Sequence, residues 1–144
     1  MTSTSGTVQT FADCLREIIA ENGGDIFIAS TQERIIGVYA GKENPFTGKI
    51  AVRLAAELFP CGVCTSSGTV GSSFSYGVAD AAMIVAPDTA LADAVATAAA
   101  NLVKDGDCVA AACNYAMSIP TVQAALIVCG DQLAAAGQLE LVQI

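Results

Sequence analysis

Two alanine-rich segments with helical spacing follow one another directly in the second half of the chain, and strand-like runs flank them on both sides. The first extends from Pro87 to about Val103 with Asp88 as its candidate N-cap, and the second extends from Cys108 to Met117. Two helices in succession break the alternation of strand and helix that is typical of a parallel sheet. This order predicts an α+β fold in which an antiparallel sheet carries helices on one face.

The other segments are short and rich in β-branched residues, which favours strands. We expect a first helix over residues 7–22, because apolar residues at helical spacing stop there at two glycines. Residues 25–30 and 34–40 are expected to pair as an antiparallel hairpin. Further strands are expected over residues 49–54, 79–86, 122–129, 132–136 and 139–144. The stretch from Cys61 to Gly77 has the composition of a functional loop, and residues 1–144 are expected to form a single domain.

The charge balance limits the partners of this chain. Fourteen acidic and six basic residues give a net charge of −8, which repels nucleic acids and anionic lipid surfaces. No stretch reaches the roughly 18 uncharged apolar residues that span a bilayer. We therefore expect a cytoplasmic protein with no nucleic-acid or membrane partner. The mean hydropathy of +0.57 predicts additional cover for the alanine-rich helices, either from a homo-oligomer or from another part of the same polypeptide.

The available side chains narrow the chemistry. The chain has no histidine, which excludes a Ser-His-Asp triad and zinc sites that need imidazole. Cys61 and Cys64 form a C-x-x-C, but Cys108 and Cys113 diverge by about 140° on a helix and fit a shared metal poorly. We interpret the cysteines as small buried hydrophobic residues. A cation bound by oxygen atoms is the metal chemistry that these residues favour.

The first alanine-rich helix carries oxygen-bearing side chains at a spacing of four residues. Asp93, Thr97 and Asn101 are therefore stacked one turn apart. We expect the apolar positions at helical spacing to face the core, namely Leu91, Val95, Ala98 and Leu102. An Asp and a Thr at i and i+4 present a carboxylate and a hydroxyl oxygen to the same Mg²⁺ or Ca²⁺. The alternative interpretation of these residues is a solvated helix face.

Two further segments suit a bound anion or hydroxyl-rich ligand. Glycines and hydroxyl side chains alternate in the loop from residue 65 to residue 75, and its candidate binding residues are Thr65, Ser66, Ser67, Gly68 and Thr69. No lysine follows Gly71, so the loop is not a Walker phosphate loop; its alternative interpretation is a surface loop. At the Asn22–Asp25 junction, the carboxylate of Asp25 suits a ribose or an amide donor. The alternative there is a helix stop followed by a strand.

Three stretches together resemble one family. They are Glu21-Asn-Gly-Gly-Asp-Ile26, the Val63–Gly71 run, and the Pro87–Thr97 run with its Ala-Leu-Ala-Asp-Ala-x-Ala-Thr segment. In order and spacing they resemble the C-terminal portion of the ApbE-like flavin-transferase superfamily, and most closely its uncharacterised soluble branch. The resemblance implies a T-fold-like layer of helices on an antiparallel sheet, often assembled with symmetry mates. It also implies FAD or FMN and Mg²⁺ as cofactors, with Asp93 and Thr97 as metal ligands and Asp25 at the dinucleotide.

The chain departs from the transferase pattern in two ways. Transferases of the superfamily carry a His-x-x-Asp-Pro-x-Thr-Gly segment after the Ser-Gly loop, whereas Ser73–Asp80 leads directly into a strand here. The Asn44–Gly48 loop resembles part of that segment but lies upstream, so no role is transferred to it. This departure argues against full FMN-transferase activity. The match also begins partway along the family, so we expect the family's N-terminal portion to be missing from this chain.

The sequence leaves three functions open. The first is a flavin- or nucleotide-binding protein that uses Asp93 and Thr97 for a cation, Asp25 for ribose or adenine, and the Ser-Gly loop for phosphate. The second is a Mg²⁺-dependent, transferase-like enzyme acting on another small metabolite, with Asp80 or Asp93 as acid–base and a metal-activated water. The third is a non-catalytic assembly domain. We favour the first.

Overall fold

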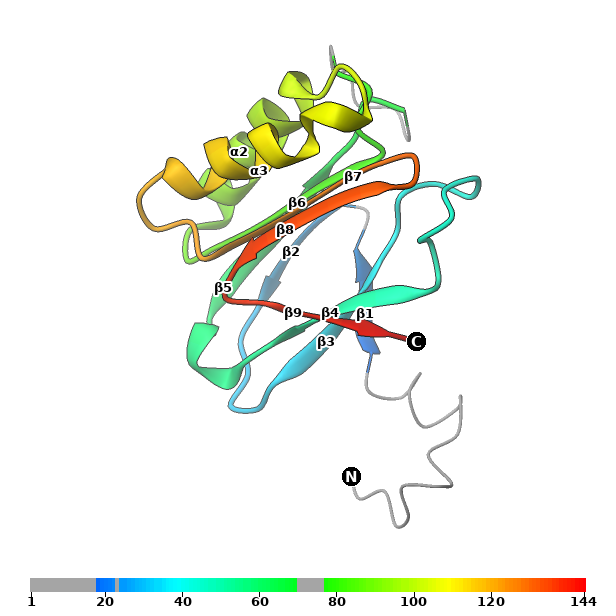
Figure 1. Cartoon of the computed structure of the whole chain (residues 1–144). Coiled ribbons are helices and arrows are strands. Elements are labelled where there is room, and N and C mark those ends of the chain that lie inside the picture. Colours follow the sequence, from blue (N-terminus) through cyan, green and yellow to red (C-terminus); the bar gives the residue numbers. More distant parts are fainter. Residues whose placement is uncertain (1–17, 23, 70–76) are drawn as a thin grey trace.

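The chain forms two β-sheets and a layer of two helices, as the computed structural model describes for residues 18–22, 24–69 and 77–144. Both helices cover one face of a five-stranded sheet, and a four-stranded sheet lies against its other face (Figure 1). The predicted α+β class is confirmed. Among the described residues, no helix has the length and apolar character needed to cross a bilayer.

The five-stranded sheet is antiparallel throughout and has the order β2-β5-β6-β7-β8. Its strands are β2 (Asp25–Ile28), β5 (Cys61–Ser66), β6 (Ala81–Ala86), β7 (Ala124–Cys129) and β8 (Gln132–Gly137). The four-stranded sheet has the order β1-β3-β4-β9, with β1 parallel to β3 and the other pairs antiparallel. Its strands are β1 (Ile18–Asn22), β3 (Arg34–Val38), β4 (Ile50–Leu54) and β9 (Glu140–Gln143).

The helices are α2 (Thr89–Leu102) and α3 (Val109–Ser118), both close to their expected bounds. Asp88 caps α2 as predicted, because its carboxylate accepts a 2.9 Å hydrogen bond from the backbone N–H of Ala90. The first turn of α2 lies very close to β5: a Cβ on Gly62 would come within 2.6 Å of the Cα of Thr89. A glycine in the strand thus allows this close approach.

The core lies on both faces of the five-stranded sheet. Alternate residues of β6 take part in two apolar clusters, with Ile84 facing the helices and Met83 and Val85 facing the second sheet. All six residues of β6 are buried. This central position explains why the segment reads as an unbroken apolar run rather than an alternating one.

Several expectations about the first half of the chain are wrong. Residues 18–22 form strand β1 beside β3 instead of ending a helix, while residues 7–17 lie outside the described residues. Residues 25–28 and 34–38 do not form a hairpin, because β2 pairs with β5 whereas β3 pairs with β1 and β4. The two strands instead belong to different sheets and contribute Ile28 and Ile36 to the cluster between the sheets. The structure therefore has two packed sheets where one was expected.

The segment from Cys61 to Ser66 was expected to be a loop and forms strand β5. Its first four residues are buried and pair with β2, and Gly62 to Cys64 also pair with β6. The small side chains of this strand allow α2 to pack closely against it. A composition that is typical of loops is therefore explained here by close packing between a helix and a strand. The later part of the segment, residues 70–76, lies outside the described residues.

Candidate functional site

Four of the predicted site residues lie around the end of β5 that is covered by α2. Asp25 of β2 is directly opposite Cys64 of β5, and Cys64 belongs to the cluster on the helix side of the sheet. Because side chains alternate along a strand, Ser66 lies on the same face. The hydroxyl oxygens of Ser66 and Thr97 are 3.1 Å apart, which joins the end of β5 to α2.

Asp93 lies one helical turn before Thr97 on α2. Both side chains are exposed, so water and solutes reach their oxygen atoms. Because Thr97 contacts Ser66 of β5, and Asp93 is stacked one turn before it on the same side of α2, Asp93 also lies toward β5. We call the set Asp25, Ser66, Asp93 and Thr97 the α2–β5 site.

Cys64 reports on the electrostatics of this site. Burial raises the pKa of its thiol to about 12, with further contributions from the charge of Asp25, a hydrogen bond to Asp25 and the charge of Asp93. The thiol also lies 3.5 Å from the carbonyl oxygen of Thr89, which accepts its hydrogen bond. Cys64 is thus a neutral thiol at physiological pH, and thiolate chemistry is not its role. The site is a negative environment with hard oxygen atoms at its rim.

The C-x-x-C pair does not act as a unit. Cys61 belongs to the cluster between the two sheets, whereas Cys64 belongs to the cluster beneath the helices. Burial raises the pKa of Cys61 to about 11. The interpretation of these cysteines as small buried residues is confirmed for both. Within the part of the chain that the structure describes, no three Cys, Asp or Glu side chains are grouped to hold a metal ion.

The buried face of α2 differs from the predicted stripe. Val95 is buried as expected, but Leu102 is 46% exposed. The face that meets the sheet is formed by Ala92, Val95, Ala96, Ala99 and Ala100. Alanines allow α2 to lie close to the strands, so a stripe chosen by the largest apolar residues is displaced around the helix. Of the predicted polar row, Asp93 and Thr97 are exposed, whereas Asn101 is half-buried.

The predicted phosphate-loop residues have different partners. The N–H of Thr65 donates to the carbonyl oxygen of Gly24 across β2 and β5. Ser67 is 9% exposed, and its hydroxyl donates to the carbonyl oxygen of Ala79 and accepts from the N–H of Thr69. The N–H of Gly68 donates to that same carbonyl. Ser67 and Gly68 therefore fix the loop to the chain before β6, and the Ser66 hydroxyl contacts Thr97 of α2.

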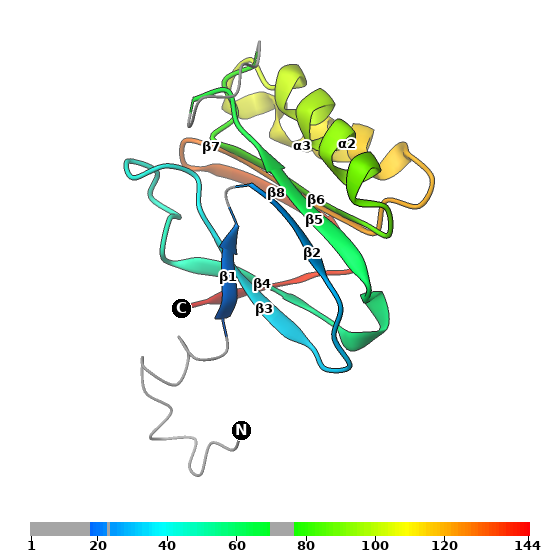
Figure 2. The same cartoon turned by 180° about the vertical axis from the view of Figure 1, so that it is seen from behind.

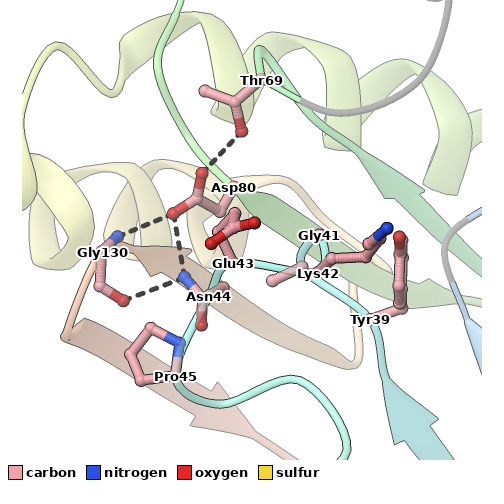
Figure 3. Close-up of a pocket in the computed structure, with 10 residues that line it drawn as sticks. Tyr39, Gly41, Lys42, Glu43, Asn44, Pro45, Thr69, Asp80 and Gly130 are labelled. Atoms are coloured by element: carbon pink, nitrogen blue, oxygen red, sulfur yellow. Dashed lines mark hydrogen bonds between the residues drawn. The ribbon is translucent and has the colours of Figure 1, made fainter.

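A pocket of about 540 Å³ lies on another side of this loop (Figure 3). It is lined by the residue 39–45 segment together with Thr69, Asp80 and Gly130. Asp80 is its polar centre: one carboxylate oxygen accepts from Asn44 Nδ2 at 2.9 Å and from the N–H of Gly130 at 2.8 Å. The hydroxyl of Thr69 donates to the other oxygen. The pocket is not lined by Asp93 or Thr97.

Asn44 connects these loops, and the sequence did not single it out as a site residue. It is only 8% exposed; its amide nitrogen also donates to the carbonyl oxygen of Gly130, and its side-chain oxygen accepts from the N–H of Phe46. Both carboxylate oxygens of Asp80 are engaged by protein donors, which identifies Asp80 as an anchor between three loops. The signal for Asn44 was the Asn-Pro pair in a glycine-containing loop, a typical turn former.

The fold and these residues define a class of protein: a layered α+β chain with exposed oxygen-bearing side chains where α2 packs against β5. A family model described as "AbpE bacteria" matches residues 5–134, and the chain belongs to this family. The UPF0280 protein of Methanocella arvoryzae is 41% identical over 125 residues, which cover 84% of this chain and 49% of that protein.

Other UPF0280 proteins show similar relationships. The protein of Methanosarcina barkeri is 38% identical over 122 residues, covering 84% of this chain and 47% of its own length. The protein of Methanocaldococcus jannaschii is 48% identical over 94 residues, covering 64% of this chain and 38% of its own length. This chain thus spans about half the length, or less, of these relatives.

Proposed function

We propose that this chain binds a flavin or nucleotide ligand together with a divalent cation, Mg²⁺, at the α2–β5 site. The proposal extends the resemblance of the sequence to ApbE-like flavin transferases. The proposal rests on the proximity of Asp25, Ser66, Asp93 and Thr97. These residues come from three separate elements and lie around one end of β5. Such a meeting of oxygen-bearing side chains suits a polar ligand better than a solvated helix face.

The chemistry of Mg²⁺ fits an open site with few protein ligands. Mg²⁺ in proteins is usually held by one or two carboxylates, with waters and the phosphates of a substrate completing its shell. Asp93 would supply a carboxylate and Thr97 a hydroxyl oxygen, while the exposure of both leaves room for phosphate. Asp25, also exposed, would accept a hydrogen bond from a ribose hydroxyl or from a ring N–H. The negative environment favours the cation.

We propose binding rather than flavin transfer as the activity. The chain contains no histidine, so the histidine-bearing segment of the transferases has no counterpart. Asp80, the nearest carboxylate to the missing segment in sequence, is engaged with Asn44, Gly130 and Thr69. A protein that holds a flavin or a nucleotide without transferring it is consistent with both observations.

A second candidate is the binding of another small metabolite in the pocket beside Asp80. Its volume of about 540 Å³ accommodates a small molecule. Lys42, Glu43 and Tyr39 line it with an ammonium group, a carboxylate and a phenol (Figure 3). Thermal-shift screening of metabolites separates this candidate from the first, because Lys42→Ala would abolish the shift here and Asp93→Asn would not.

We also propose that the chain is a cytoplasmic homo-oligomer. Leu102 and Tyr115 are large apolar side chains that remain exposed on the two helices, and association would cover them. Light scattering coupled to size exclusion tests the oligomer: a mass larger than 14.5 kDa per particle is expected, and a monomer at micromolar concentration would contradict it.

Isothermal titration calorimetry tests the binding proposal. We expect FAD, FMN or ADP to bind the wild-type chain in Mg²⁺ and to bind much more weakly in EDTA. Asp93→Asn and Thr97→Val should each reduce the affinity at least about tenfold, since each removes a cation ligand. Asp107→Asn is the matched control, because Asp107 is an exposed carboxylate outside the site. No heat from any of these ligands in Mg²⁺ would refute the proposal.

A further inference from the structure

Phe27 is an aromatic side chain on β2 that stays 61% exposed. Strand β2 is the edge strand of the five-stranded sheet, and α2 packs over β5 and β6 instead (Figure 2). The register places Phe27 opposite Gly62 and Asp25 opposite Cys64. Since Gly62 abuts Thr89 of α2 and Cys64 faces the helices, Phe27 lies on the helix side of the sheet, beside the helix and not beneath it.

The position of Phe27 relative to the α2–β5 site follows from strand geometry. Residues two apart on a strand are about 7 Å apart, so Phe27 and Asp25 are neighbours on one face. Gly62, which is opposite Phe27, and Ser66 are four residues apart on β5, or about 13 Å. Thr97 contacts Ser66, and Asp93 lies one helical turn, or about 6 Å, closer to Thr89. Measured along the strand direction, the cation ligands are therefore about 7 to 13 Å from Phe27. A ribose or ribityl linker followed by one or two phosphates extends from a planar ring over a comparable length.

We propose that Phe27 is the stacking surface for the planar heteroaromatic ring of the ligand, an isoalloxazine or an adenine. This inference rests on the proposed function, because the phosphate and the cation of the same ligand occupy the α2–β5 site. The ring lies on the exposed face of Phe27, bounded on one side by Thr89 at the start of α2. Asp25, two residues away, accepts a hydrogen bond from a ring N–H. Aromatic rings stack on bases of any identity, so Phe27 selects for planarity and Asp25 adds the polar contact.

Titrations with ring-bearing and ring-free ligands test the inference. In Mg²⁺, we expect Phe27→Ala to weaken binding of FMN or ADP about tenfold and to leave binding of inorganic pyrophosphate unchanged. Phe27→Tyr keeps the ring and should bind within about twofold of the wild type. Leu141→Ala is the control: Leu141 is 39% exposed and lies on β9 in the four-stranded sheet, away from the α2–β5 site. The comparison of FMN with ADP tells which ring the site takes.

A second readout uses the absence of tryptophan from this chain. Phe27→Trp introduces a single tryptophan, which can be excited selectively over the three tyrosines, and FMN should quench its emission with the same dissociation constant that calorimetry gives. If the wild type binds FMN or ADP while Phe27→Ala binds them equally well and Phe27→Trp is not quenched, the stacking role is refuted and the proposed function stands. If the wild type binds neither ligand in Mg²⁺, both the stacking role and the proposed function are refuted. A change of oligomeric state in Phe27→Ala with unchanged affinity would assign Phe27 to a contact between copies and would also refute the stacking role.

Discussion

Removing the Asp80 carboxylate should destabilise the fold by a predictable amount. Asp80→Ala deletes the acceptor of three hydrogen bonds, from Asn44, Thr69 and the N–H of Gly130. A hydrogen bond to a charged group contributes about 1.5–3 kcal/mol, but the three share one carboxylate and are not additive. Asn44 keeps its bond to the carbonyl of Gly130, and Asp80 is only half-buried. We therefore expect a loss of about 3 kcal/mol in the free energy of unfolding.

Urea denaturation followed by circular dichroism measures this loss. The midpoint should fall at an unchanged m-value, and the melting temperature should fall by about 10 °C. Asp80→Asn is the conservative variant, since its oxygen still accepts from Asn44 and Gly130 and its amide donates to Thr69; we expect a loss of about 1 kcal/mol. Asp131→Ala, at the same turn, should lie within about 0.5 kcal/mol of the wild type. An Asp80→Ala variant as stable as the wild type would refute the anchoring role.

Three further outcomes follow from the environment of β5. Gly62→Ala should lower the free energy of unfolding by about 2 kcal/mol in urea titrations, because its Cβ would meet Thr89 at 2.6 Å; unchanged stability would contradict this contact. The Cys64 pKa of about 12 lies above the ordinary 9.0, so the neutral thiol stabilises the fold below pH 9 and that contribution is lost as the pH rises toward 12. Between pH 9 and 11, Cys64→Ala should therefore lose stability less steeply than the wild type, and parallel curves would argue against it. Mg²⁺ should raise the melting temperature of the wild type but not of Thr97→Val, and equal shifts would exclude Thr97 as a ligand.

Local signals made the second half of the chain predictable. The N-cap Asp88 and the alanine-rich run that follows it define α2 without any long-range information. The strands after α3 are separated by Gly130 and Gly137, both of which adopt positive φ in the structure. The relationship between β2 and β3 was not predictable in this way. Apolar alternation is the same whether two strands pair edge to edge or pack face to face across a core.

The candidate site shows the same difference between local and long-range information. The i, i+4 relation of Asp93 and Thr97 is a property of one helix and can be read from the sequence. The contact between Thr97 and Ser66, and the pairing of Asp25 with Cys64, depend on sheet register and helix placement. The resemblance to a known family gave an expectation of a shared site for Asp25, Asp93 and Thr97. It gave none for Asn44, whose partners are 36 and 86 residues away in sequence.

A cation held by Asp93 and Thr97 is the central claim, and anomalous diffraction tests it directly. Crystals soaked with Mn²⁺ and ADP, with data collected near the manganese edge, should show an anomalous peak bonded to the Asp93 carboxylate and the Thr97 hydroxyl, on the Ser66 side of α2. Mn²⁺ replaces Mg²⁺ because both prefer octahedral oxygen ligands. A well-ordered structure with no peak at these two oxygen atoms, or with its peak elsewhere in the chain, would contradict the claim.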